Sequence, residues 1–149
     1  MLRPYRSADL SALALLFYHT VHTVCTRDYT PQQLDAWASG SIDEAAWDAS
    51  LRAHVTQVAE VSGEIVGFGD MDESGYLDRL YVAAEWQHCG IATAICDALE
   101  AAVPSACYTT HASKTARTFF EQRGYRVLYA QQVVRQGVTL TNYVMEKKN

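Results

Sequence analysis

The sequence is poor in the residues that mark several common classes of protein. It has four cysteines, without a CxxC pair or a zinc-finger spacing, and only three prolines. This cysteine pattern argues against a disulfide scaffold and against a zinc finger, so we expect reduced thiols. Lysine and arginine number 12 against 17 acidic residues, which gives a net charge of −5. Nucleic acids and anionic membranes attract basic side chains, so neither is an expected partner, whereas a cationic ligand would be tolerated.

Long hydrophobic runs are also missing. The most apolar stretch, Leu10 to Val24, is interrupted by His19, Thr20 and His22. It is too short to span a bilayer, and no small-residue cleavage site follows it. We therefore expect no membrane partner and a cytoplasmic location.

The 149 residues are 49% hydrophobic, which is enough for one sizeable core. No repeat, linker or low-complexity segment divides the chain, so we predict a single domain over residues 1–149. The expected helices are Asp9–Cys25 with Ser7 as its cap, one beginning after Thr30-Pro31 with Gln33 at the third position, Glu44–Leu51, and one after Gly90. The expected strands are Met1–Tyr5, Val55–Val61, Glu64–Met71, Tyr76–Val82, Ala106–Thr110, Arg126–Val134 and Val138–Lys147. This order predicts an α/β (α+β) fold with a mixed central sheet of about six to seven strands flanked by helices.

The most informative segment is the one that leads from the strand Tyr76–Val82 into the next helix. It contains Gln87, His88, Cys89, Gly90, Ile91 and Ala92. The first N–H groups of a helix have no partner inside the helix, and the helix dipole adds positive charge there. Gly90 lets an anion approach the main chain without a Cβ in the way. The segment therefore predicts a phosphate-binding loop.

A second motif follows about 20 residues later. Ser113 is predicted to cap a helix in which Phe119 and Phe120 point inward, and Gly124 ends that helix. The chain here resembles the GNAT superfamily of acetyl-CoA-dependent N-acetyltransferases. The resemblance rests on Leu80-Tyr81-Val82, on Gln87 to Ala92, and on Ala116 to Tyr125, which occur in the order of that superfamily.

The resemblance implies a GNAT acyl-CoA N-acyltransferase fold and acetyl-CoA as co-substrate. The acceptor would be a primary amine of a small molecule or peptide, which attacks the thioester directly in a ternary complex. The residues that would bind the cofactor are Leu80, Tyr81, Val82, Gln87, His88, Cys89, Gly90, Ile91, Ala92, Ser113, Ala116, Phe119 and Phe120. The N–H of Val82 would face the thioester carbonyl and stabilise the oxyanion.

Catalytic groups can be suggested on the same basis. Asp78 lies two residues before Leu80, so alternation along a strand predicts that both side chains share a face. Asp78 is our first candidate for the general base, directly or through water; the alternatives are a surface pair with Arg79 or a lysine, or a hydrogen bond at the strand end. Glu64, Asp70, Asp72 and Glu73 could supply a more remote base or hold a cationic acceptor. Many GNAT members have a tyrosine where Phe120 stands, so the general acid must come from elsewhere. We favour Tyr143, with Tyr108 and His111 as the other candidates.

The N-terminal helices are expected to build the acceptor wall, as in the superfamily. His22, Asp28 and Tyr29 are the predicted substrate-binding residues, and Trp37 and Trp47 either frame the pocket or anchor the core. His19, His22 and Cys25 are spaced by three on one helix, which makes a metal site conceivable, but we expect no metal.

Several alternatives stay open. Phe120 would also suit a catalytically silent acyl-CoA-binding sensor or partner module of the same fold. A cysteine hydrolase built on Cys107 or Cys25 has no supporting signature around either residue. The acceptor could be a polyamine, an aminoglycoside, an amino acid, or a protein N-terminus or lysine. Tyr125, Tyr129 and the last two strands could supply a homodimer interface.

Overall fold

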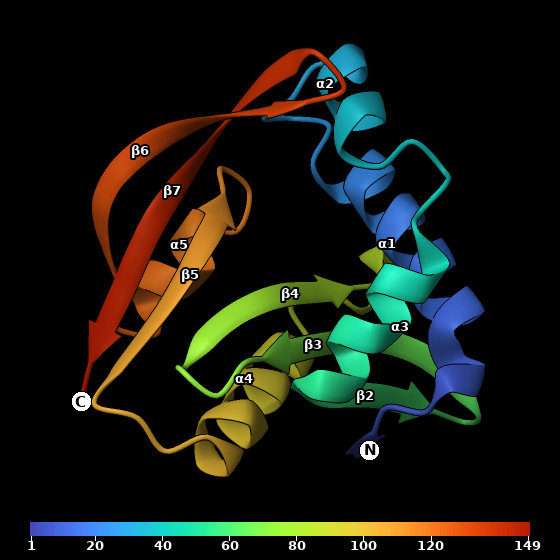
Figure 1. The fold of residues 1–149 in the computed structure, drawn as a ribbon, viewed down its shortest axis with the longest axis vertical. Helices are drawn as coiled ribbons and strands as arrows, with labels where there is room; N and C mark the ends of the chain where they lie inside the picture. Colours follow the sequence, from blue (N-terminus) through green and yellow to red (C-terminus); the bar gives the residue numbers. More distant parts are fainter.

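One seven-stranded mixed sheet runs through the computed structural model, which describes residues 1–149 (Figure 1). The strands are β1 (Leu2–Pro4), β2 (Val55–Val61), β3 (Glu64–Met71), β4 (Tyr76–Val82), β5 (Cys107–Ser113), β6 (Arg126–Arg135) and β7 (Val138–Lys148). They lie in the order β1-β2-β3-β4-β5-β7-β6, and only the β4–β5 pair is parallel. The predicted mixed α/β sheet is confirmed.

The helices are α1 (Leu10–Val24), α2 (Pro31–Trp37), α3 (Glu44–Ala53), α4 (Ile91–Ala102) and α5 (Arg117–Gln122). The predicted capping box of α2 is present, since Thr30 and Gln33 exchange hydrogen bonds. The predicted cap of the first helix is wrong. Ser7 lies inside a short 3₁₀ helix that precedes α1, and the Asp9 carboxylate, which accepts from the N–H of Arg6 (2.9 Å), closes that turn instead. None of the helices is both long and apolar enough to cross a membrane.

The helices cover the two faces of the sheet. Helices α1 and α3 pack on one face of β2–β4, and α4 packs on the other (Figure 1). Helix α4 comes very close to β3, because a Cβ at Gly69 would lie only 2.8 Å from the Ile95 side chain. Two hydrophobic cores result, one centred on Leu13, Phe17 and Phe68 and the other on Ile95 and Leu99.

The sheet opens between β4 and β5. These strands pair only at Tyr76–Thr109 and Leu77–Thr110. Beyond these two pairs they diverge, as Figure 1 shows, so the second half of β4 has no neighbour on that side. The free edge exposes main-chain N–H and C=O groups that would otherwise bind a strand.

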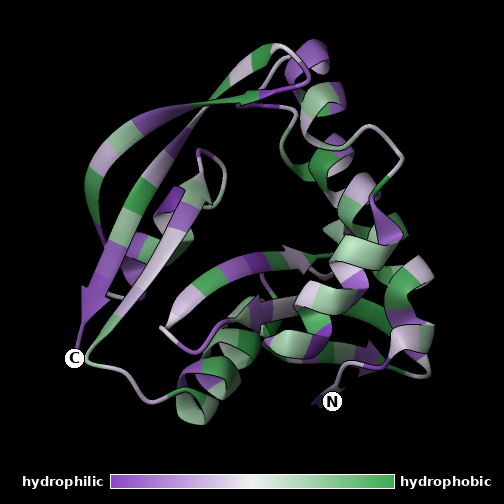
Figure 2. Cartoon of the chain, in the orientation of Figure 1, coloured by the Kyte–Doolittle hydropathy of each residue, from purple (hydrophilic) through white to green (hydrophobic).

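A β-bulge in β4 changes the side-chain pattern that strand alternation predicts. Asp70 of β3 pairs with Arg79, while its neighbour Met71 pairs with Leu77, so Asp78 is an extra residue without a partner. Figure 2 shows a hydrophilic band in the middle of β4, the strand that contains Asp78 and Arg79. Our prediction that Asp78 and Leu80 share a face is wrong, because the bulge turns Asp78 to the side of Arg79, whose Nη1 lies 3.3 Å from its carboxylate.

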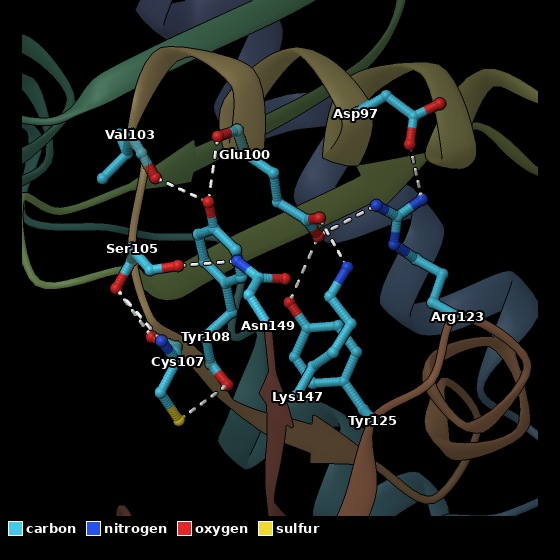
Figure 3. Close-up of polar contacts among 10 residues, drawn as sticks. All are labelled: Asp97, Glu100, Val103, Ser105, Cys107, Tyr108, Arg123, Tyr125, Lys147 and Asn149. Carbon is cyan, nitrogen blue, oxygen red and sulfur yellow. Dashed lines mark hydrogen bonds and ion pairs between the residues drawn. The ribbon is translucent and has the colours of Figure 1, made fainter.

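A partly buried charge network joins α4 to α5 and β7 (Figure 3). Glu100 is its centre, and its carboxylate accepts from Arg123 Nη2 (2.9 Å) and from Lys147 Nζ (2.5 Å). Its side chain is 15% exposed. Arg123 also pairs with Asp97 (3.0 Å), whose side chain is 66% exposed.

The two acidic partners of Arg123 should therefore differ strongly in their effect on stability. We expect Glu100→Gln to lower the free energy of unfolding by about 3 kcal/mol, because it leaves two cations partly buried without a carboxylate. Asp97→Asn removes an exposed partner of the same guanidinium and should cost less than about 1 kcal/mol. Urea unfolding of both variants tests this, and equal effects would contradict it.

Candidate active site

The gap between β4 and β5 contains a cavity of about 590 Å³. All the residues predicted to bind the cofactor line it except Cys89. Cys89 is exposed, and its thiol donates to the carbonyl of Gln87 (3.4 Å). Cys25, Trp86 and Gln122 also line the cavity and were not predicted to do so. The sequence motifs therefore converge on one hollow, although they are up to 40 residues apart.

The loop before α4 presents unpaired main-chain donors to this cavity. His88 and Gly90 both have positive φ angles, of 61° and 82°. The N–H groups of His88, Cys89 and Gly90 donate to no protein group, and the carbonyl of Gly90 accepts from Ala94 (3.0 Å) as α4 begins. Together with the first N–H groups of α4, these donors form a concave site that suits a phosphate.

The free edge of β4 supplies further donors. Ala83 N–H donates to the carbonyl of Val66 (2.8 Å), so the facing residues Val82 and Gly67 form a non-hydrogen-bonded pair of the ladder. The N–H groups of Leu80 and Val82 therefore point away from β3 and into the gap. An extended ligand lying in the gap can form strand-like hydrogen bonds with them.

The opposite wall comes from β5 and α5. The predicted helix cap at Ser113 is wrong, because β5 extends to Ser113 and α5 begins only at Arg117. The Ser113 hydroxyl accepts from the N–H of Ala116 (3.1 Å) and so holds the turn before the helix. Phe119 is half-buried, and Phe120 is buried against Tyr125 with ring centroids 5.2 Å apart.

A second cavity, of about 290 Å³, lies on the side of α1 and α2. We call it the acceptor cavity. Six aromatic residues line it: Phe17, Tyr29, Trp37, Trp47, Tyr76 and Tyr81. Tyr29, a predicted substrate-binding residue, is held by two hydrogen bonds, because its hydroxyl donates to the Thr141 carbonyl (2.7 Å) and accepts from Lys114 N–H (2.9 Å).

The other two predicted substrate-binding residues lie outside both cavities. A nitrogen of His22 lies 2.7 Å from the Ala38 carbonyl, and the ring stacks on Tyr18, so His22 fixes α1 to the segment after α2. Asp28 is exposed and accepts from the Thr115 hydroxyl (2.8 Å). Both side chains thus hold neighbouring segments together.

The two cavities meet. The residues that line both are Trp37, Asp78, Arg79, Tyr81, His111 and Ser113. The ring of Tyr81 packs on Phe17, 4.9 Å between centroids, and therefore lies on the acceptor side of β4. Asp78 and His111 are the side chains at this junction of the types that serve as general acids and bases in enzymes.

A largely buried cluster of charged side chains, made by Asp70, Arg79 and His54, adjoins the junction of the two cavities. Asp70 is fully buried, and its Oδ2 accepts from Arg79 Nη1 (2.6 Å) and lies 2.7 Å from His54 Nδ1. Burial raises the pKa of Asp70, an effect that Arg79 and His54 oppose. The guanidinium of Arg79 stacks on Trp47 (4.6 Å to the ring centroid) and also reaches Asp78. Arg79 is thus fixed from three sides and in turn positions Asp78.

The cluster of His54, Asp70 and Asp78 is also the group of residues whose ligand atoms approach one another, within 4.8 Å, as a metal site would require. The Arg79 guanidinium already lies between its carboxylates. His19, His22 and Cys25 do not form such a group. Sequence reasoning missed His54 and considered Asp70 only as a more remote base or a group that could hold a cationic acceptor, although a carboxylate within the apolar strand β3 indicates a buried ion pair.

Comparison with known proteins agrees with this architecture. Residues 25–147 match the family model "Acetyltransferase (GNAT) domain". The chain is 33% identical over 147 residues to the uncharacterized N-acetyltransferase YafP of Escherichia coli K12, which covers 99% of this chain and 95% of that protein. A crystal structure from Rhodopseudomonas palustris, described as a GCN5-related N-acetyltransferase and as a class-II aminotransferase, is 33% identical and has a TM-score of 0.94, covering 100% of this chain and 95% of that one.

A PaiA N-acetyltransferase from Thermoplasma acidophilum, solved in complex with coenzyme A, shares the fold at 14% identity, with a TM-score of 0.79 over 100% of this chain and 98% of that one. Taken together, the split sheet, the helix-opening loop and these relatives define the class of the protein as an acyltransferase. More specifically, the chain belongs to the GNAT family of acetyltransferases.

Proposed function

We propose that the protein transfers an acetyl group from acetyl-CoA to a primary amine by direct attack in a ternary complex. The observation that carries the proposal is the meeting of the two cavities at Asp78 and His111. The larger cavity offers an anion site and a free strand edge, which suit the pyrophosphate and the amide-containing arm of coenzyme A. The PaiA relative that shares the fold was solved with coenzyme A.

In this arrangement the thioester lies at the end of the free edge of β4. The N–H of Val82 points into the gap and would donate to the thioester oxygen as it becomes negative. Such a donor is fixed before the reaction, and removing one in other enzymes costs about 3 kcal/mol in the barrier. A side-chain substitution at Val82 would leave this donor in place.

Asp78 is the proposed general base. An amine is protonated near neutral pH and must lose a proton before it can attack. Asp78 lines both cavities, and its carboxylate is held by Arg79 at 3.3 Å. It can take the proton directly or through one water.

For the general acid, the placement of side chains favours His111 over Tyr143. Tyr143 lines neither cavity, and its ring packs under the guanidinium of Arg117 (4.6 Å). The hydroxyl of Tyr108 donates to the Val103 carbonyl (2.7 Å), so that residue is occupied in the core. His111 lies at the junction, edge-on to Tyr76 with ring centroids 5.2 Å apart. We propose that His111 supplies the proton to the departing thiolate.

Binding and turnover can be tested in one sample. We expect calorimetric titration with acetyl-CoA to show one site per chain, and subsequent addition of amines to release free thiol. Acetyl-pantetheine, which lacks the pyrophosphate, should bind at least tenfold more weakly, because it cannot use the loop before α4. Binding without release from any amine would support the silent sensor that Phe120 also suits. Absence of binding would refute the proposed function.

A further inference from the structure

The charges that line the acceptor cavity are mainly positive. Its ionised side chains are one carboxylate, Asp78, and two guanidiniums, Arg79 and Arg135. Asp78 pairs with Arg79, and Arg79 is also held by the buried Asp70. Arg135 is then the one cation of the lining that has no carboxylate partner, in a chain whose net charge is −5. A cavity with this balance disfavours polycations such as polyamines and aminoglycosides.

Arg135 has no acidic partner anywhere in the structure. It is the last residue of β6, it is exposed, and its side chain hydrogen-bonds only the carbonyl of Val134 (3.3 Å). Eight of the other arginines and lysines contact an Asp or Glu side chain within 4.0 Å. Arg6, Arg27 and Lys114 also lack such a partner, but they line neither cavity. An unpaired guanidinium at the rim of a substrate cavity is well suited to bind a carboxylate in two parallel hydrogen bonds.

Arg135 and Asp78 line the acceptor cavity together with Tyr76. Burial raises the pKa of the Tyr76 hydroxyl to about 12; the charge of Asp78 acts in the same direction, and the charge of Arg135 opposes it. A ligand carboxylate bound to Arg135 and a ligand amine that loses its proton to Asp78 would therefore lie in the same cavity. A small molecule that carries both an amine and a carboxylate can place them in this way.

The cavity is small and has aromatic walls with polar groups among them. The aromatic walls are completed by Val133 and Leu140, Ser113, Thr141 and Asn142 add polar groups, and the volume is about 290 Å³. That is the lower end of the range for small-molecule sites. The aromatic walls favour an aromatic or branched aliphatic body, through burial and ring contacts.

From this charge and shape we infer that the acceptor is a small amino acid-like amine, with an aromatic or apolar side chain between the rings and a carboxylate bound to Arg135. The inference rests on the proposed function. In the reaction, the amine nitrogen bonds to the thioester carbon and the carbon–sulfur bond breaks. The ammonium first loses one proton to Asp78, which releases it to solvent. As the nitrogen bonds, its second proton goes to Asp78, and the sulfur leaves as a thiolate that takes a proton from His111, giving an N-acetyl amino acid, coenzyme A and one proton in solution.

Matched pairs of amines test the role of the carboxylate. We would measure thiol release with phenylalanine and phenethylamine, tryptophan and tryptamine, and leucine and isopentylamine, in which each second member lacks only the carboxylate. Spermidine serves as the polycation. At least one amino acid should have a kcat/KM about ten- to hundredfold above that of its decarboxylated partner, the range for a hydrogen bond to a charged group. Spermidine should be the poorest acceptor.

Variants in β6 test which residue binds the carboxylate of the acceptor. Arg135→Gln should lower the ratio of kcat/KM within a pair by about tenfold or more, mainly through KM, and Arg135→Lys should restore part of it. Arg126→Gln, at the other end of the same strand and paired with Glu146 (2.9 Å), should leave the ratio unchanged. The inference fails, and the proposed function stands, if decarboxylated amines or spermidine react best or if Arg135→Gln leaves the ratio unchanged. Acetyl-CoA binding without thiol release from any amine would refute both.

Discussion

Replacing Gly90 by valine should reduce the affinity for acetyl-CoA by at least about a hundredfold while the protein stays folded. Gly90 has a φ of 82°, a conformation that a β-branched residue adopts only with strain. A Cβ at Gly90 would meet no protein atom within 4 Å, so the side chain would occupy the space in front of the loop. In the proposed function, the pyrophosphate occupies that space to reach the free N–H groups of the loop. Calorimetric titration with acetyl-CoA measures the loss.

Gly63→Val is the matched control for this change. Gly63 lies in the turn between β2 and β3, with a φ of 80° and no protein atom within 4 Å of a Cβ. Both variants should lose a similar amount of stability, about 1 to 3 kcal/mol, because both force the same backbone strain. Only Gly90→Val should lose acetyl-CoA affinity. Equal affinities in the two variants would show that the loop before α4 does not bind the cofactor.

Local sequence signals were sufficient for most elements of the fold. The strands β2, β3 and β4 begin and end at the predicted residues, because their turns, such as Ser62-Gly63, are marked by glycine within the turn itself. The capping box of α2 could likewise be predicted, because Thr30 and Gln33, which form it, are only three residues apart. The phosphate-binding loop could be predicted for the same reason, because its proposed function depends on local main-chain geometry and on a glycine.

Features set by pairing between distant strands could not be predicted. The bulge at Asp78 follows from the register in which β4 pairs with β3, and no residue type in β4 indicates it. With this bulge, Asp78 lines both cavities, and Arg79 contacts both Asp70 and Asp78. The direction of the Tyr143 side chain also depends on strand pairing. Its neighbour in β7, Asn142, lines the acceptor cavity, whereas Tyr143 does not. Only the assembled sheet decides which of these neighbours faces the substrate.

The acceptor wall was predicted in part. Tyr29 lines it as expected, and Trp37 and Trp47 prove to be both core residues and lining residues. His22 was misplaced because its helix turns it toward Ala38, a contact 16 residues away. Arg135 drew no attention in the sequence, since a single arginine before a Gln-Gly turn resembles any solvated hairpin end. Only the assembled fold brings Arg135 and Tyr76 into the lining of one cavity.

Replacing Asp78 by asparagine should lower kcat by about a hundredfold to ten thousandfold, the usual contribution of a general base. The change keeps the shape of the side chain and leaves Arg79 anchored on Asp70, so the junction should keep its geometry. Acetyl-CoA affinity should be unchanged, because the phosphate loop is untouched. Asp97→Asn, at an exposed carboxylate on α4, is the matched control and should retain full activity.

The pH profile separates this role from a purely structural one. Amines of this kind have pKa values of about 8 to 10, so a base matters most below that range, where the acceptor is protonated. The Asp78→Asn variant should therefore recover part of its rate as the pH rises and the amine deprotonates in solution. A uniform loss at every pH would mean that Asp78 acts only by holding Arg79. An unchanged kcat in Asp78→Asn, with a loss in His111→Asn that is largest at low pH, would transfer the role of base to His111.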